Sequence, residues 1–285
     1  MSKKLPVSIL FLNLMIVLLC GFESIAEEID QSANANVYEV SEFLDEAQYN
    51  EYMNGAGLLF DKLLAFRRRL ADSSDFAFYS FANNFIEVID REIPKMCVVN
   101  HSTEYEGDSQ YEIDGERITA AEAIQVSDRF FTLFPLKISV GRSFEPSDFD
   151  CQNAETIPVI LGDAYRESFH LGDTFEGYYI CERSSFTVVG FTDAESVFYL
   201  RGNNCMAPYG RFIIMPFENI EEDSYSARAI LLQQICGFVA THGSGESASE
   251  TIRAYLTESG LENWYGAITV YEKSLQEKMN GWTNY

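Results

Sequence analysis

The chain has 285 residues, and its 44 acidic side chains outnumber its 20 Lys and Arg side chains, for a formal net charge of −24. A surface this acidic repels phosphate backbones, so nucleic acid is excluded as an expected partner. Hydrophobic residues make up 47% of the chain, which is enough for a packed core and excludes a largely disordered protein.

The first predicted element is an apolar segment, Leu5–Phe22, which has 18 residues and no charged side chain. Its length is at the short limit for a membrane-spanning helix. Lysines precede it and glutamates follow it, which places the N-terminus in the cytoplasm and the bulk of the chain outside. Segment 1–26 is predicted to be a membrane anchor or a signal peptide. Cleavage after Ala26 is the alternative, because Ser24 and Ala26 are small residues of the kind that signal peptidase requires.

The segment that follows is predicted to contain a linker, a helix and a strand. Residues 27–40 are polar and small and fit a linker or a first extended piece. Helical spacing of Leu and Phe predicts a helix over 41–70 that begins with Ser41 as its cap. The aromatic residues after it predict a strand over 76–90, with a bulge at Asn83–Asn84.

The middle of the chain is predicted to be rich in short strands. Turn residues at 106–108 and at Asp114–Gly115 predict β-hairpins. An apolar strand near 158–161 is followed by a short helix from Asp163, and further strands are predicted over 184–200 and up to Pro216.

The last part is predicted to return to longer elements. Alternating apolar residues predict a strand over 227–243. A helix is predicted over 247–260, with Ser247 or Ser249 as its cap and Gly260 at its end. A final strand is predicted over 264–273.

This order of elements predicts an α+β fold with one subdomain inserted into another. Both chain ends, 27–95 and 217–285, are predicted to form an α/β subdomain. Residues 96–216 are predicted to form an inserted β-rich subdomain.

The sequence predicts no catalytic residue, no cofactor site and no metal site. It has three histidines and lacks the spacings that mark zinc proteases and serine hydrolases. His170 is expected to be a partly packed surface residue. An acidic run over 104–116 fails the spacing of a calcium loop, because Ala121 falls at the last ligand position. A hydrolase that uses two carboxylates is a remaining hypothesis, although no pair stands out.

Six cysteines are present, of which Cys20 lies in the apolar segment. The other five allow at most two disulfides within one chain, and none of them forms a C-x-x-C pair. One bridge with isolated thiols and two bridges are both left open.

The segment Val126–Asp150 is the most distinctive in the chain. Ser127 is predicted to cap a short helix that places three phenylalanines on one side, and Pro135 ends it. A turn at Gly141 follows, and Arg142 is expected to pair with Asp148. The segment is interpreted as an aromatic plug closed by an ion pair, with no nucleophile or base.

Four blocks of sequence, in order between Val126 and Phe217, resemble the MacB-like periplasmic core domain found in FtsX-like permeases of ABC transporters. They read V-S-x-x-F-F with G-R-x-F and Asp, then "PVILGDAYRESF" with "GDTFEG", then "FTVVGFTDA", then "FIIMPF". The residues that carry this structural signature are Ser127, Phe130, Phe131, Gly141, Arg142, Phe144, Asp148, Gly162, Phe169, Gly190 and Pro216.

The resemblance implies a porter-like α/β subdomain made by both chain ends, an inserted β-rich subdomain and one N-terminal membrane helix. It implies a non-catalytic extracytoplasmic domain that transmits motion or senses a ligand or partner. Its partners would be a cytoplasmic ABC ATPase, other permease helices or subunits, and an extracytoplasmic protein or peptide.

The sequence departs from a full permease at its C-terminal end. Further membrane helices follow this domain in the family, whereas this sequence ends at "EKMNGWTNY". We therefore expect a truncated permease or a free-standing homologue. The alternative function is a binding module of the same fold, secreted or anchored.

Overall fold

The computed structural model describes residues 36–55, 58–99, 109–150, 155–180, 182–200, 205–220, 222–241, 245–265 and 269–270. The helices are α1 (Glu46–Asn54), α2 (Leu58–Ala71), α3 (Phe130–Leu133), α4 (Tyr225–Ile235) and α5 (Gly245–Ser259). Short 3₁₀ helices are η2 (Lys95–Cys97), η3 (Pro146–Phe149), η5 (Asp163–Glu167) and η6 (Tyr209–Arg211). The strands are β1 (Asn36–Val40), β2 (Ala77–Ile89), β3 (Gln110–Ile113), β4 (Glu116–Val126), β5 (Ile138–Gly141), β6 (Ile157–Leu161), β7 (Thr174–Tyr179), β8 (Glu182–Thr192), β9 (Val197–Leu200), β10 (Cys205–Pro208), β11 (Ile213–Pro216), β12 (Gly237–Thr241) and β13 (Thr269–Val270).

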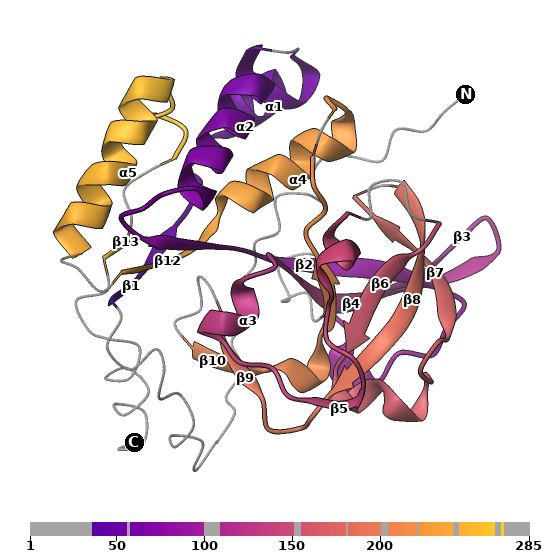
Figure 1. Ribbon diagram of the computed structural model, residues 1–285. Coiled ribbons are helices and arrows are strands. Elements are labelled where there is room, and N and C mark those ends of the chain that lie inside the picture. Colours follow the sequence, from indigo (N-terminus) through magenta and orange to yellow (C-terminus); the bar gives the residue numbers. More distant parts are fainter. Residues whose placement is uncertain are drawn as a thin grey trace.

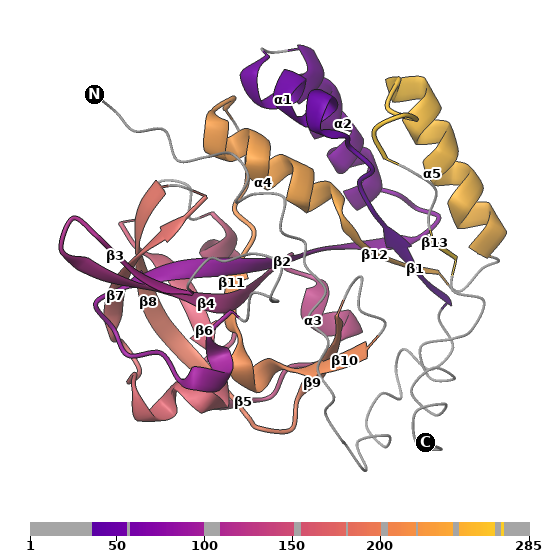
Figure 2. The same ribbon diagram turned by 180° about the vertical axis from the view of Figure 1, so that it is seen from behind.

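An antiparallel sheet in the order β13–β1–β12–β2 forms one part of the molecule. Helices α1, α2, α4 and α5 lie together on one side of it (Figure 1). Their apolar side chains, such as Phe60 and Leu63 of α2 and Leu231 of α4, are buried against that side. Short α3 and the β9–β10 hairpin lie on the opposite side, as the view from behind also shows (Figure 2). The sheet is therefore covered on both faces.

The other part of the molecule is a closed β-barrel. Strand β2 continues beyond the sheet and pairs with β4 and β7, and the ring β2–β7–β8–β6–β11–β4 closes back on β2. Side chains from alternate positions fill its interior, among them Ile86, Val159, Phe175, Phe186 and Ile213. Strand β3 extends the ring beside β4, and β5 pairs with β8.

The two predicted features of the β2–β4 region had different outcomes. The hairpin at Asp114–Gly115 is confirmed, because both residues have positive φ (53° and 87°), as a two-residue turn between twisted strands requires. The bulge at Asn83–Asn84 is wrong. Residues Phe81–Ile89 pair with β4 in an unbroken register, which leaves no extra residue at Asn83–Asn84.

Helix starts and one strand were predicted wrongly. Ser41 caps no helix; α1 begins after Asp45, whose side chain accepts from the N–H of Gln48 (2.8 Å) in a capping box. The predicted strand over 227–243 is helix α4 followed by β12. Its alternation was misleading because α4 is buried almost all round, so its pattern lacks a polar face.

The C-terminal helix and the final strand follow the prediction in type but not in bounds. Helix α5 begins at Gly245, so neither Ser247 nor Ser249 is its cap. Gly260 ends the helix with a φ of +64°, as predicted. Strand β13 is described only at Thr269–Val270.

Strand β2 belongs to the segment predicted as the α/β subdomain, yet most of its length pairs with β4 in the predicted insertion. The apolar segment Leu5–Phe22 and the hairpin predicted at 106–108 lie outside the described residues. Within the described part of the chain, no helix is both long and apolar enough to cross a membrane.

Candidate functional site

One signature residue, Phe130, belongs to a cluster of five phenylalanines where the sheet and the barrel join. We call this cluster the aromatic junction; its members are Phe81, Phe130, Phe134, Phe198 and Phe238. Phe130 stacks on Phe81 of β2 at 5.2 Å between ring centroids and lies 6.4 Å from Phe238 of β12. All five side chains are at most 2% exposed. The junction therefore brings together residues of the sheet, the barrel and the covering elements.

Helix α3 positions two members of the junction, four residues apart. Phe130 and Phe134 lie on its buried side, and the Tyr209 hydroxyl donates to the carbonyl oxygen of Phe134 (2.9 Å). The predicted cap at Ser127 is wrong. The residue before α3 is Arg129 and makes no side-chain capping bond, and the Ser127 hydroxyl has no hydrogen-bond partner. Burial of the rings therefore holds this single turn.

The other three phenylalanines of the segment, Phe131, Phe144 and Phe149, lie outside the junction. Phe131 and Phe144 are half-buried and stack on each other at 6.1 Å with ring planes 25° apart. Because Phe131 follows Phe130 directly in α3, its side chain leaves the helix in a different direction. Phe131 still packs against the edge of the same cluster, with its ring centroid 6.0 Å from that of Phe130, so the prediction that three rings share one side holds only in part.

The predicted ion pair between Arg142 and Asp148 is confirmed. Nη1 and Nη2 of Arg142 donate to the two carboxylate oxygens of Asp148 at 2.5 and 3.0 Å, and the backbone N–H of Glu145 donates to the same carboxylate at 2.7 Å. We call this group the loop clasp. Burial alone would raise the pKa of Asp148, but these hydrogen bonds and the positive charge of Arg142 outweigh it and lower the pKa.

Glycines in the signature stand where backbones touch. Gly141 has a φ of +81° and its hypothetical Cβ would lie 2.4 Å from the carbonyl oxygen of Val189. Gly190, opposite it on β8, would meet the carbonyl oxygen of Arg142 at 2.4 Å. Gly162 would meet the carbonyl oxygen of Gly210 at 2.1 Å. A side chain at any of these positions would push two backbone segments apart.

The remaining signature residues belong to the barrel. Phe169 is buried beside Phe175, with ring centroids 5.3 Å apart. Pro216 ends β11 next to Val126, and its carbonyl oxygen accepts from the Gln125 side chain (3.1 Å). Both residues are buried, so their contacts are structural.

A shallow, open depression adjoins the loop clasp on the outside of the barrel. Its lining residues are Arg142, Ser147, Asp148, Asp150, Thr156, Pro158, Thr187 and Val189. Its charged groups are already engaged, because Arg142 pairs with Asp148 and the Asp150 carboxylate accepts from Asn219 (2.6 Å). The depression therefore presents the negative charge of Asp150, which a neutral amide does not cancel, and no unpaired cation among its lining residues.

Two buried polar clusters were missed by the sequence analysis. Both carboxylate oxygens of Glu122 accept from the guanidinium of Arg211, and the two side chains are only 3% and 14% exposed. Burial raises the pKa of Glu122, and the hydrogen bonds from Arg211 partly offset that rise. The only signal was a glutamate among the alanines of β4. The sequence does not show which distant arginine forms the ion pair with this glutamate.

The second buried cluster joins the barrel to helix α4. The Tyr179 hydroxyl donates to the side-chain oxygen of Gln125. The Asn84 amide donates to Tyr179 (3.1 Å) and to Gln233 of α4 (2.9 Å). Burial raises the pKa of Tyr179 far above its ordinary value, so the phenol stays neutral. The hydrogen bonds of this cluster thus hold the barrel against α4, and its phenol does not serve as an acid or a base.

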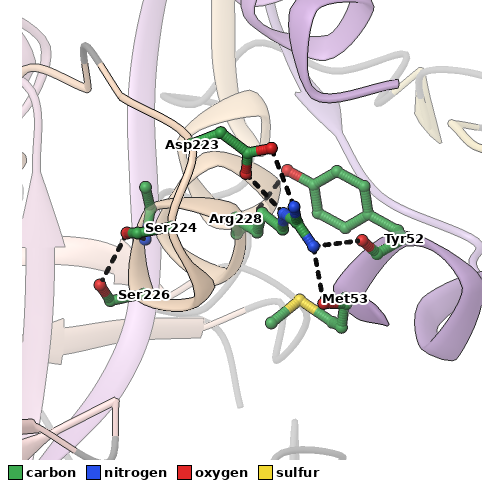
Figure 3. A network of polar contacts seen from close by, with 7 residues as sticks. Tyr52, Met53, Asp223, Ser224, Ser226 and Arg228 are labelled. Atoms are coloured by element: carbon green, nitrogen blue, oxygen red, sulfur yellow. Dashed lines mark hydrogen bonds and ion pairs between the residues drawn. The ribbon is translucent and has the colours of Figure 1, made fainter. Parts of the chain in front are cut away.

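Arg228 anchors the other end of α4 to α1 (Figure 3). Its guanidinium pairs with both oxygens of Asp223 (2.5 and 2.8 Å) and donates to the carbonyl oxygens of Met53 (2.9 Å) and Tyr52 (3.5 Å). These carbonyls belong to the last turn of α1, where a cation also complements the helix dipole. Arg228 therefore caps α1 from a neighbouring helix.

A scan of protein families gives one decisive match. The family model described as the MacB-like periplasmic core domain matches residues 7–255. The chain belongs to this family. No curated protein matches it.

Two solved structures are similar to this MacB-like domain. The periplasmic region of MacB from Actinobacillus actinomycetemcomitans aligns with a TM-score of 0.45 and 11% identity, over 90% of this chain and 96% of the other. The extracellular domain of the noncanonic ABC-type transporter YknZ from Gram-positive bacteria aligns with a TM-score of 0.42 and 10% identity, over 81% and 99%.

The resemblance read from the four sequence blocks is confirmed by the family match. The MacB-like domain is an extracytoplasmic, non-catalytic domain of the ABC-transporter type, with a mixed α/β fold.

Histidine, cysteine and metal-ligating side chains are the types that catalysis most often uses. The His170 side chain lies 3.7 Å from Asp173 on the surface, as predicted, but at 83% exposed it is not partly packed. His101 and His242 lie outside the described residues. Burial raises the pKa of the Cys97 thiol to about 11, so the thiol is protonated at neutral pH and is a poor nucleophile. The described residues contain no cluster of three or more metal-ligating side chains.

The described cysteines give a partial answer on disulfides. Cys97 and Cys236 are both buried, and neither forms a disulfide. Cys20, Cys151 and Cys181 lie outside the described residues, and of Cys205 only the backbone is described.

Proposed function

We propose that this chain is the extracytoplasmic domain of an ABC-transporter permease, held at the membrane by segment Leu5–Phe22. It works with a cytoplasmic ATPase and further permease helices or subunits, and it transmits motion or contacts an extracytoplasmic protein or peptide. The observation that carries the proposal is the family match over residues 7–255, which begins inside the apolar segment itself.

The pairing of β1 with β13 supports this placement. Tyr38 is opposite Val270 and Glu39 is opposite Thr269 in an antiparallel ladder. The start of β1 and the end of β13 therefore adjoin, so segments 1–35 and 271–285 connect to the sheet at the same end. A sheet connected in this way suits a porter-like subdomain built from both chain ends, with one end directed toward the membrane.

The described side chains suit a mechanical or binding role rather than chemistry. The ionisable groups in the core, such as Glu122 and Tyr179, are taken up by hydrogen bonds between elements. They hold the sheet, the barrel and α4 together. We therefore assign ATP hydrolysis to a separate cytoplasmic component.

The full chain with a C-terminal affinity tag tests the proposal. We expect it in the membrane fraction after alkaline carbonate washing, with its bulk open to protease added from outside the cytoplasm. We also expect co-purification, in mild detergent, of an ATPase encoded next to it. A chain that is membrane-bound but never retains an ATPase under crosslinking would contradict the permease assignment.

A second candidate is a secreted binding module of the same fold, favoured by the small residues Ser24 and Ala26 before Glu27. N-terminal sequencing of the exported chain separates the two. A mature protein that starts at Glu27 and appears in the soluble fraction supports the binding module and refutes the anchor.

A further inference from the structure

Strand β2 runs without interruption from the sheet into the barrel. Ala77–Ser80 pair with β12, and Phe81–Ile89 pair with β4. At the crossing point the N–H of Phe81 donates to the carbonyl oxygen of Cys236 (3.1 Å), and the carbonyl oxygen of Ser80 accepts from the N–H of Ser127 (3.1 Å). The strand contains no glycine or proline. No glycine there relaxes the φ/ψ restrictions of the backbone, and the pairing with β12 and β4 holds it in an extended geometry.

The aromatic junction covers the same crossing point from the side opposite the helices. Phe81 lies 5.5 Å from Phe238 of β12 and 5.6 Å from Phe198 of β9. Phe134 contacts Phe238 with ring centroids 5.3 Å apart. These rings come from β12 of the sheet, from β2, which the sheet and the barrel share, and from β9 and the α3 segment, which cover the sheet. Bending β2 here would separate rings that are fully buried.

Helix α4 makes a second connection on the helix side. Arg228 holds α1 at one end of α4, and near its other end Gln233 accepts from Asn84 of the barrel. The Ser80 hydroxyl also donates to the carbonyl oxygen of Gln234 (2.7 Å). The main hydrophobic core is continuous as well, because it contains side chains of α2 and α4 together with those of the barrel interior.

From these contacts we infer that the sheet with its helices and the barrel form one cooperative unit without a hinge, joined at the aromatic junction around Phe130. A displacement applied at the end of the sheet where β1 and β13 adjoin is carried to the barrel as a rigid-body movement. The inference concerns the mechanics of this chain alone. It stands or falls independently of whether an ATPase or permease is its partner.

Hydrogen–deuterium exchange of the full chain in detergent, read by mass spectrometry across a urea series, tests this inference. Peptides from α2 and from β7–β8 report the two parts. We expect both to lose protection at the same urea concentration, as parts of one cooperative unit do. Amides of Tyr79–Ala82 are expected to exchange within about tenfold of those of Phe85–Val88, because no local opening occurs at the crossing.

A pair of matched variants makes the test specific to the junction. Phe130→Ala removes the central ring of the junction, whereas Phe186→Ala removes an equally buried ring from the barrel interior, stacked on Phe175 at 5.1 Å. We expect Phe130→Ala to separate the two transitions along the urea axis. We expect Phe186→Ala to shift both transitions together to lower urea.

Several results would overturn the inference. Separate transitions in the unmodified chain, or rapid exchange confined to Tyr79–Ala82, would reveal a hinge. Coincident transitions in Phe130→Ala would show that the junction does not join the parts. If Phe130→Ala does not fold, Phe130→Leu is used instead, with Phe186→Leu as its control. Phe130→Leu must then separate the two urea transitions more than Phe186→Leu does. A larger separation in Phe186→Leu would contradict the inference.

Discussion

The aromatic part of segment Val126–Asp150 lies in the core, whereas the part that carries the loop clasp lies on the surface of the barrel. Phe130 is fully buried among the rings of the junction. Arg142, in the clasp, has a side chain that is 41% exposed. Both parts belong to the same signature. The first stabilises the fold by burying apolar side chains, and the second by an ion pair.

Burial of apolar area is worth far more than a partly exposed ion pair. A buried Phe side chain contributes about 1.5–3 kcal/mol through transfer from water, before any packing is counted. An exposed ion pair contributes about 1 kcal/mol or less, because water screens it and two long side chains lose freedom. The aromatic part should therefore determine stability, while the clasp shapes one loop.

The largest expected effect comes from the junction. Phe130→Ala should cost about 3–5 kcal/mol, summed over the two unfolding transitions expected for this variant, because it leaves a cavity among fully buried rings. Phe131→Ala is the matched control in the next position. Its half-buried ring should cost less than half as much, and urea denaturation followed by circular dichroism measures both. Equal losses for the two variants would contradict the burial difference seen in the structure.

A smaller effect is expected at Gly190 of β8, which lies against the backbone of the loop clasp. Gly190→Ala should cost about 1–3 kcal/mol, because the new Cβ would lie against the carbonyl oxygen of Arg142. Gly172→Ala provides a contrast, since its φ is positive (+84°), unlike that of Gly190, but a Cβ there would meet nothing within 4 Å. Thermal unfolding should rank Gly190→Ala below Gly172→Ala. The reverse order would mean that backbone strain, not close approach, governs this region.

The smallest effect, and the one that depends on pH, is expected for the clasp itself. Asp148→Asn should cost about 1 kcal/mol near neutral pH, because one partner of the pair is largely exposed. The pKa of Asp148 is lowered from its ordinary 3.8, so its stabilisation is present above that pH and is lost as pH falls through the folded-state value. The difference between the native chain and the variant should thus shrink below about pH 4. A difference that stays constant down to pH 2 would contradict this.

Local features of the segment were predictable from sequence where neighbours in the chain decide them. Arg142 and Asp148 are six residues apart with a turn between them, so their pairing needs no distant element. The hairpin at Asp114–Gly115 was predictable for the same reason, since few residues adopt positive φ there. The ordered motifs also identified the family, which the match over residues 7–255 confirms.

Features decided by distant partners were not predictable. Helix α4 was interpreted as a strand because a helix buried on nearly every side carries no amphipathic pattern. Phe131 was grouped with Phe130 although only Phe130 faces Phe81 and Phe238. Glu122 gives no sign in the sequence that Arg211 lies against it.

What the sequence by itself determined is the family, the non-catalytic character expected from it, and those turns and pairs whose cause lies within a few residues. The tertiary structure alone decided that β2 is shared by the sheet and the barrel, and that five phenylalanines from separate elements meet at their junction. The reason is physical: strand pairing and ring packing depend on which segments, far apart in the chain, come into contact.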